Sequence, residues 1–273
     1  MKKPRDRGKP LDEARFAAWL ESFAGYRSHI SRTKIENWIA QFTAADKDLA
    51  ARVLDAVEFY RPDKLENAYS SILGKLPGWS RVANGREGRW RFVPFTMRSG
   101  ESGDMMLSVF RTANKLNTKP FDELFVYKAD LLKEDLGPGD TVVFVDDFAG
   151  SGDQAVTAWD ESLEELLPGK PKTFLILVSA IQDAITRIAT ETPLKVHAYR
   201  HLRASDNFFA NACSHFSRFE KQRVLHYCAR ANADHPRGYG SCGLLIVMAH
   251  RCPNNSLPIL HSKRPTFRGL FPR

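Results

Sequence analysis

The first quarter of the chain is patterned for helices. Between residues 11 and 76, apolar side chains recur every three or four residues, the spacing that places them on one buried helix face. They fall into three groups, which are Phe16, Trp19, Leu20 and Phe23, then Ile35, Trp38, Ile39 and Phe42, then Leu49, Val53, Leu54, Val57 and Tyr60. We expect three or four short helices, as a helical or winged-helix module or as a cap on the domain that follows.

From residue 80 onward the pattern changes to strands alternating with helices. Strand character is found in 91–97, 123–128, 141–146, 173–179, 195–199 and 243–249, and helical spacing in 104–116, 153–167 and 180–190. The runs TVVFV and FLILV are apolar at successive positions, which suits a parallel sheet covered by helices on both faces. The pattern predicts an α/β fold of the Rossmann-like, three-layer kind over 80–273, with the helical module over 1–79 and an irregular C-terminal arm from Cys252.

Charge adds information about partners. The formal net charge is +8, and from Arg187 onward lysine and arginine far outnumber the acidic residues. That half favours a polyanion or a phosphorylated ligand, although scattered arginines that only solvate a surface explain it equally well. Aromatic residues alternate with bases between 208 and 227, a stretch that either stacks nucleic-acid bases or packs an aromatic helix face.

The cysteines and the lack of long apolar runs indicate a cytoplasmic protein. Four cysteines do not make a disulfide scaffold and fit a reducing compartment. Cys213-x-His215 and His226-x-Cys228 offer zinc-type ligands, but a spacing of two splays each pair apart on a helix, so reduced core cysteines are favoured. No apolar run reaches the roughly 18 residues of a membrane span.

The segment 141–154, TVVFVDDFAGSGDQ, carries the candidate chemistry. In an open parallel sheet, ligands bind beyond the carboxyl ends of the strands, where helices begin with unpaired N–H groups. Gly150 and Gly152 let the backbone approach an anion, Ser151 offers a hydroxyl, and a helix from Asp153 adds its dipole. The pattern predicts a phosphate-binding loop.

Two carboxylates, Asp146 and Asp147, are expected at the mouth of the same strand. Adjacent carboxylates repel one another unless they have separate partners. In a first alternative, one carboxylate accepts hydrogen bonds from ribose hydroxyls while the second carboxylate faces a metal ion or an amide. In the other alternative, Asp147 caps the loop and only Asp146 is exposed.

The motif resembles parts of three families. The string GSGDQA satisfies a G-x-G-x-x-A dinucleotide fingerprint, but that motif requires an acidic residue about 20 positions later, where the next strand ends in LVSAIQ. The string DDFAGSG resembles the D-P-F-x-G-S-G motif of S-adenosylmethionine-dependent DNA methyltransferases. Those enzymes carry a second motif, [DNS]-P-P-[YFW], and this chain has no Pro-Pro pair.

The third resemblance is to the type I phosphoribosyltransferase fold, in which an apolar strand, two acidic residues and a small-residue loop follow in order. It implies that Asp146 and Asp147 are the catalytic carboxylates, addressing the ribose hydroxyls of phosphoribosyl pyrophosphate. It also implies a 5-phosphate loop made of Ala149, Gly150, Ser151, Gly152, Asp153 and Gln154. Gln154 departs from the usual Thr or Ser, which removes one hydroxyl donor to the phosphate.

The same resemblance implies a second loop that binds pyrophosphate with Mg²⁺. It is expected after the strand 91–97, and it consists of Arg98, Ser99, Gly100, Glu101, Ser102 and Gly103. No metal ligand set made of side chains alone is predicted. An acid–base residue is not evident; Asp153, Lys128 and Arg200 are candidates by position.

The wider layout resembles the phosphoribosyltransferase-like effectors of bacterial conflict systems, including retron anti-phage modules. The resemblance rests on IENWIAQF, a Tyr-Arg-Pro, SGESGD, FVDDFAGSGDQ and an arm that runs from CPNNSLPIL to LFPR. It implies a toxin-like or sensing role in defence, with a reverse transcriptase and its RNA–DNA product as partners. Two functions stay open: a pentosyltransferase, or a non-catalytic nucleotide sensor whose basic C-terminal half binds nucleic acid.

Overall fold

The computed structural model describes residues 11–97 and 101–273. The chain divides into two compact units. The sheet unit is Asp63–Arg203, and the terminal unit combines the residues up to Pro62 with Ala204–Arg273. The sequence places the boundary at residue 79 and assigns 80–273 to one domain, whereas in this division the last 70 or so residues pack with the N-terminal helices.

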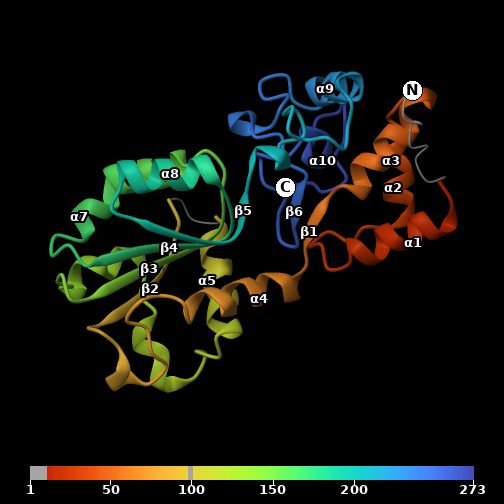
Figure 1. The fold of residues 1–273 in the computed structure, drawn as a ribbon. Helices are drawn as coiled ribbons and strands as arrows, with labels where there is room; N and C mark the ends of the chain where they lie inside the picture. The colour runs from red at the N-terminus through yellow and green to blue at the C-terminus, as the bar shows by residue number, and fades with distance from the viewer. Residues whose placement is uncertain (1–10, 98–100) are drawn as a thin grey trace. The chain divides into compact units, whose positions relative to one another are not determined.

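The sheet unit is built on four parallel strands in the order β2-β3-β4-β5 (Figure 1). The strands are β2 (Trp90–Pro94), β3 (Thr141–Ala149), β4 (Lys172–Ile181) and β5 (Lys195–Leu202). The helices are α4 (Pro62–Leu73), α5 (Ser102–Ala113), α6 (Asp153–Ala158), α7 (Glu164–Leu166) and α8 (Gln182–Glu191). Short turns of 3-10 helix occur at η2 (Ala83–Gly85), η3 (Lys119–Leu124) and η4 (Lys128–Glu134), and a π-helical turn, η5 (Trp159–Leu163), joins α6 to α7.

Helices cover both faces of this sheet, which explains why its strands are apolar at successive positions. The register aligns Val93, Phe144, Leu175 and Val196 in one row, and this face packs against η4, α6 and α8. On the other face, the ring of Phe92 lies 4.9 Å from that of Phe110 in α5. Figure 1 shows α7 and α8 on one side of the sheet and α4 and α5 on the other. The predicted three-layer α/β fold with a parallel sheet is confirmed.

Two predicted strands of this unit are absent from the structure or shorter in it. The segment 123–128 is not a strand, because Phe125 makes a single parallel bridge to Phe92 between two 3-10 turns. The apolar run of this segment places the Phe125 ring 5.5 Å from that of Phe92, and the segment forms no continuous ladder. The strand predicted over 91–97 ends at Pro94, and the Met97 amide donates to the Glu101 carboxylate at 2.7 Å instead of to a neighbouring strand.

The terminal unit combines helices from both ends of the chain with a small sheet. Its helices are α1 (Glu13–Ser22), α2 (Arg32–Ile39), α3 (Lys47–Asp55), α9 (Arg218–Ala231) and α10 (Pro258–His261), with short 3-10 turns η1 (Ala44–Asp46), η6 (Ala204–Asp206) and η7 (Tyr239–Ser241). The strands β1 (Glu58–Tyr60) and β6 (Ile246–Met248) pair in parallel. The helical spacing predicted through Tyr60 therefore ends at Asp55, and the strand predicted over 243–249 belongs to this small sheet.

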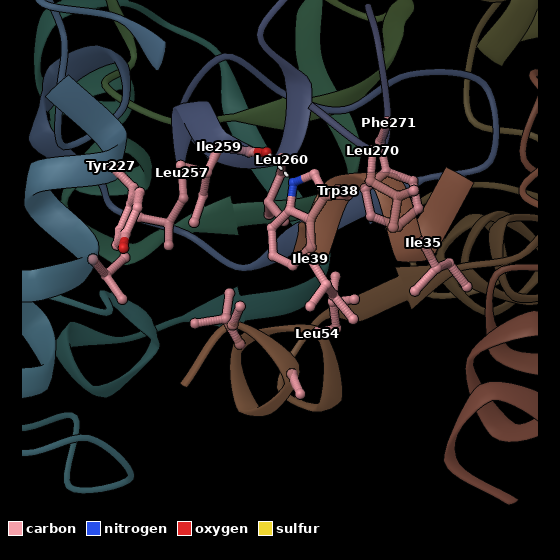
Figure 2. Close-up of a cluster of buried hydrophobic side chains, with 14 of the residues drawn as sticks. Ile35, Trp38, Ile39, Leu54, Tyr227, Leu257, Ile259, Leu260, Leu270 and Phe271 are labelled. Atoms are coloured by element: carbon pink, nitrogen blue, oxygen red, sulfur yellow. Dashed lines mark hydrogen bonds between the residues drawn. The ribbon is translucent and has the colours of Figure 1, made fainter. Parts of the chain in front are cut away.

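One apolar core joins the two ends of the chain (Figure 2). Ile35, Trp38 and Ile39 of α2 lie beside Leu257, Ile259, Leu260, Leu270 and Phe271. The Trp38 indole donates to the Ile259 carbonyl at 2.7 Å, so the polar atom of this buried ring is satisfied. The predicted irregular arm is thus a structural part of the terminal unit.

We expect the substitution Phe271→Ala to destabilise the terminal unit strongly. Phe271 is fully buried and packs edge-on against Phe23 and Tyr26, with ring centroids 4.9 and 5.3 Å apart. Emptying such a site costs about 3–5 kcal/mol in the free energy of unfolding. Urea denaturation measures the loss. The matched control is Phe219→Ala, at a ring that is 78% exposed, where less than about 0.5 kcal/mol is expected. Equal losses in the two variants would contradict the assignment of the arm to the core.

Candidate functional site

The predicted site residues gather at the carboxyl ends of β2 and β3. The chain leaves β2 toward α5 on one face of the sheet and leaves β3 toward α6 on the opposite face. Neighbouring strands whose following helices diverge in this way leave room between their loops, the place where ligands of parallel sheets bind. The loops after β2 and β3 are therefore the relevant part of the sheet unit.

The acidic pair lies inside β3, not at its mouth. β3 continues to Ala149, three residues beyond the predicted end, and Asp146 and Asp147 are only 3% and 8% exposed. The alternative in which Asp147 caps the loop and Asp146 alone is exposed is therefore wrong. Paired strands bury both residues, because β3 and β4 stay in register through Ala149 and Ala180.

One hydroxyl joins the two carboxylates. Ser102, the first residue of α5, donates from Oγ to Asp146 Oδ1 at 2.9 Å and lies 3.2 Å from Asp147 Oδ1. Asp146 Oδ1 also accepts from the Asp147 amide at 2.9 Å. Two carboxylates that were expected to need separate partners thus share one.

Burial disfavours the charged form of this pair. Desolvation, followed by the neighbouring charge of Asp147, raises the pKa of Asp146 well above its ordinary value of 3.8. The hydrogen bonds from the Asp147 amide and from Ser102 lower it in part. On balance the pKa of Asp146 is raised by burial and by the neighbouring acid.

Tyr69 of α4 forms a hydrogen bond with the same strand. Its hydroxyl donates to the Asp146 carbonyl at 2.8 Å. Burial, followed by the charges of Asp147 and Asp146, raises the pKa of Tyr69 well above its ordinary value, so the phenol stays a neutral donor. Nothing in the sequence marks this residue as part of the site, because its spacing in α4 is that of an ordinary core position.

Gly103 explains how Ser102 reaches the acids. A Cβ at this position would lie 2.5 Å from the Phe95 carbonyl oxygen and 2.8 Å from Thr96 Cγ2. Only glycine lets the start of α5 press against the end of β2 this closely. The spacing Ser102-Gly103 therefore serves a positioning function that the pyrophosphate-loop interpretation does not include.

The predicted phosphate loop, Ala149–Gln154, runs from the last residue of β3 into the first turn of α6. Gly152 has a φ of +83°, and its missing side chain leaves room for Ile188 of α8. Within the described residues, the backbone amides of Gly150 and Ser151 donate no hydrogen bond. The half-buried loop thus keeps the open donors that an anion would require.

Arg187 of α8 completes this loop, and sequence reasoning missed it. Its guanidinium forms an ion pair with Asp153 and donates to the Ser151 carbonyl at 3.3 Å. Ser151 Oγ in turn donates to Asp153 Oδ2 at 2.6 Å. Arg187 also forms an ion pair with Glu191 one turn later. This i,i+4 spacing is typical of an exposed helix surface, so the sequence alone predicts that Arg187 is a surface residue.

The second predicted loop is only partly within the described residues. Arg98, Ser99 and Gly100 lie outside them, while Glu101, Ser102 and Gly103 are described. The Glu101 carboxylate accepts from the Met97 amide and from the Gln154 side-chain amide, at 2.7 and 3.5 Å. Glu101 and Gln154 thereby connect the two loops across the ends of β2 and β3.

The remaining candidates lie elsewhere. Lys128 begins the 3-10 turn η4, because the strand predicted before it is absent, and Arg200 lies within β5, where it donates to the His201 carbonyl at 3.1 Å. The four cysteines are buried free thiols. In the described ranges, no group of three or more His, Cys, Asp or Glu side chains is arranged to hold a metal ion, and no helix is long and apolar enough to cross a membrane.

Comparison with protein families decides among the three resemblances. The PRTase-CE family model, which is phosphoribosyltransferase-like, matches residues 35–273 and so spans both units. The chain belongs to the PRTase-CE family. No curated protein matches it. The phosphoribosyltransferase-like interpretation is confirmed at the level of family and fold.

The raised pKa of Asp146 predicts how stability depends on pH. A carboxyl group with a higher pKa in the folded state binds more protons there, so the folded state loses stability as pH rises above 3.8 toward the folded pKa. The variant Asp146→Asn keeps the acceptor for Ser102 but cannot ionise. Its free energy of unfolding, measured in urea from pH 4 to 8, should rise steadily relative to that of the natural protein.

The control for this series is Asp160→Asn, which makes the same charge change at an exposed position of η5. Its difference from the natural protein should stay nearly constant across the same pH range. A flat difference for Asp146→Asn as well would show that the buried acid does not resist ionisation.

Proposed function

We propose that this protein binds phosphoribosyl pyrophosphate or a related nucleotide between the loops after β2 and β3 and catalyses pentosyl transfer. The observation that carries the proposal is the buried pair Asp146 and Asp147, held by Ser102 beside a loop with open amides. Membership in a phosphoribosyltransferase-like family supports it. We further propose, from the resemblance to conflict-system effectors, that the activity serves bacterial anti-phage defence of the retron type, with a reverse transcriptase and its RNA–DNA product as partners.

The residues present suit each part of such a ligand. The 5-phosphate would accept hydrogen bonds from the amides of Gly150 and Ser151, and it would compete with Asp153 for the guanidinium of Arg187. The acids would accept hydrogen bonds from the ribose hydroxyls in addition to those that they accept from Ser102. Phosphate binding would thus replace the ion pair between Arg187 and Asp153 with one between Arg187 and the phosphate.

A Mg²⁺ ion fits this arrangement only together with the ligand. Magnesium is usually held by one or two carboxylates plus substrate phosphates, and keeps several waters. Asp146, Asp147 and Glu101 are the acidic side chains at these two loops that would hold it. When bound, the ion would neutralise charge on a departing pyrophosphate.

The chemistry asked of the protein is stabilisation of charge. Pentosyl transfer breaks the bond from the anomeric carbon to the pyrophosphate oxygen, which leaves with the electron pair, and forms a bond from that carbon to a nucleophilic atom of the acceptor. Positive charge builds on the ribose ring between the two events. Carboxylates held under the ribose stabilise that charge most when water is excluded. The burial of Asp146 and Asp147 supports this role, because a low-dielectric setting strengthens the interaction.

The double variant Asp146→Asn, Asp147→Asn tests the proposal. The natural protein, incubated with phosphoribosyl pyrophosphate, NAD or ATP, should release pyrophosphate or nicotinamide from these compounds. We expect the double variant to lose this activity by at least about a hundredfold, since charge stabilisation of this kind is worth that much. Its melting temperature should stay within a few degrees, and Asp160→Asn should remain active. Full activity in the double variant would end the proposal.

A second candidate function is a nucleotide sensor that performs no chemistry. The observation in its favour is that the side chains at the loop already have partners, since Arg187 and Ser151 both bond to Asp153. The departure at Gln154, which removes a hydroxyl donor to the phosphate, and the lack of an evident acid–base residue in the sequence also favour a sensor. In this case the basic C-terminal half would bind nucleic acid while the sheet unit reports on the nucleotide.

The sensor alternative predicts a steep salt dependence of nucleic-acid binding. Neutralising phosphates releases counterions, so affinity should fall by about a thousandfold or more between 50 and 200 mM salt if six or more phosphates are contacted. Fluorescence anisotropy with a labelled RNA–DNA hybrid measures this. A flat response would count against nucleic-acid binding, and release of pyrophosphate would count against a purely sensing role.

A further inference from the structure

A second candidate ligand site lies in the terminal unit, at the start of α9. A cavity of about 390 Å³ is lined by Phe209, Phe216, Arg218, Lys221, Leu225 and Arg237. Small-molecule sites in proteins occupy roughly 300–1,000 Å³, so this volume admits a small ligand. The cavity is formed by residues of the terminal unit alone and is independent of the acidic pair in the sheet unit.

The side chains that line this cavity carry positive charge and no compensating negative charge. Three cationic side chains line it, and none of its lining residues is acidic. Within the part of the chain that the structure describes, the side chains of Arg218 and Arg237 form no ion pair and donate no hydrogen bond. An anion is the ligand that this electrostatic setting favours.

Neighbouring arginines behave differently, which makes the contrast informative. Arg223, also on α9, is paired with Asp46, and Arg52 is paired with Glu220. Glu220 also accepts from the Ser217 amide at 2.7 Å in the capping box of α9, so this acid of the same helix is already engaged. Asp46 and Glu220 therefore pair with arginines that do not line the cavity, and they do not neutralise its positive charge.

Lys221 is fixed at the wall instead of moving freely in solvent. Its ammonium donates to the carbonyls of Ala210 and Cys213, at 2.6 and 2.7 Å. An ammonium has three donors, so one remains for a ligand. A cation held in place before binding loses less side-chain entropy when the anion arrives.

An aromatic surface stands next to these cations. Phe209 is half-buried, with its ring edge-on to Phe208 at 5.1 Å and the guanidinium of Arg237 over it at 5.6 Å. Phenylalanine rings and guanidinium planes are the groups on which proteins stack nucleic-acid bases. The cavity thus pairs a place for a phosphate with a place for a flat ring.

We propose that this cavity binds a nucleotide, with its phosphate against Arg218, Lys221 and Arg237 and its base against Phe209. The nucleotide is either free or the terminal unit of a single strand, since the two present the same chemistry. This interpretation gives a role to the aromatic and basic stretch of 208–227, which partly packs into the core and partly lines the cavity.

Isothermal titration calorimetry with adenosine monophosphate tests the proposal on the full chain. Natural protein should bind it, while the double variant Arg218→Gln, Arg237→Gln should bind at least about tenfold more weakly, since two charge-assisted contacts are lost. Arg230→Gln is the matched control, because it removes one charge from the same helix outside the cavity and should change affinity by less than about twofold. Melting temperatures show whether each variant is folded.

Two further arms identify the ligand and locate it. Inorganic phosphate should bind much more weakly than the nucleotide, and equal affinities would overturn the role of Phe209. If only a short single strand binds, and the double variant loses it, the ligand is a strand terminus. Photocrosslinking with 8-azidoadenosine monophosphate should label peptides within 204–243. Labelling confined to 141–154, unchanged affinity in the double variant, or no binding of nucleotide or strand at millimolar concentration would each overturn the proposal.

Discussion

The hydroxyl of Ser102 is the contact on which the candidate site depends. It lies between two buried carboxyl groups of β3, and it belongs to α5, the helix that follows the neighbouring strand β2. Without a donor at that point, the burial of two adjacent acids would be opposed by both desolvation and mutual repulsion. The close approach of Gly103 to Phe95 keeps the donor in place, so a backbone packing constraint determines an electrostatic one.

The order of elements in the sheet unit follows from local patterns that the sequence displays openly. The runs TVVFV and FLILV predict buried parallel strands, and the glycines after the acidic pair predict the turn into α6. Strand ends were harder to predict. β3 runs past Asp147 because pairing with β4 continues through Ala149, and nothing in the one-dimensional pattern reveals how far a partner strand extends. The segment 123–128 shows the opposite error, since its apolar run makes one bridge and one ring contact with Phe92 and no strand.

The composition of the site was only partly accessible for a similar reason. Asp146, Asp147 and the glycine loop carry a recognisable motif, whereas Arg187 and Tyr69 reach the site from helices whose sequence pattern is that of ordinary surface and core positions. Their contribution arises from packing between elements distant in sequence. The same holds for the terminal unit, in which Trp38 and Ile259 meet across more than two hundred residues.

That long-range core bears on how the molecule is made. The apolar faces of α1–α3 leave the ribosome early, yet the segments that cover them, around Leu257 and Phe271, are synthesised only after the whole sheet unit. The sheet unit is one continuous segment, Asp63–Arg203, so all of its residues are synthesised before those that complete the terminal unit. Until translation reaches the final core residues, the N-terminal helices expose Phe23, Trp38 and Phe42, surfaces of the kind that chaperones bind. Assembly of the terminal unit is therefore a late step, and any activity that requires both units begins only when the polypeptide has been completed through Phe271.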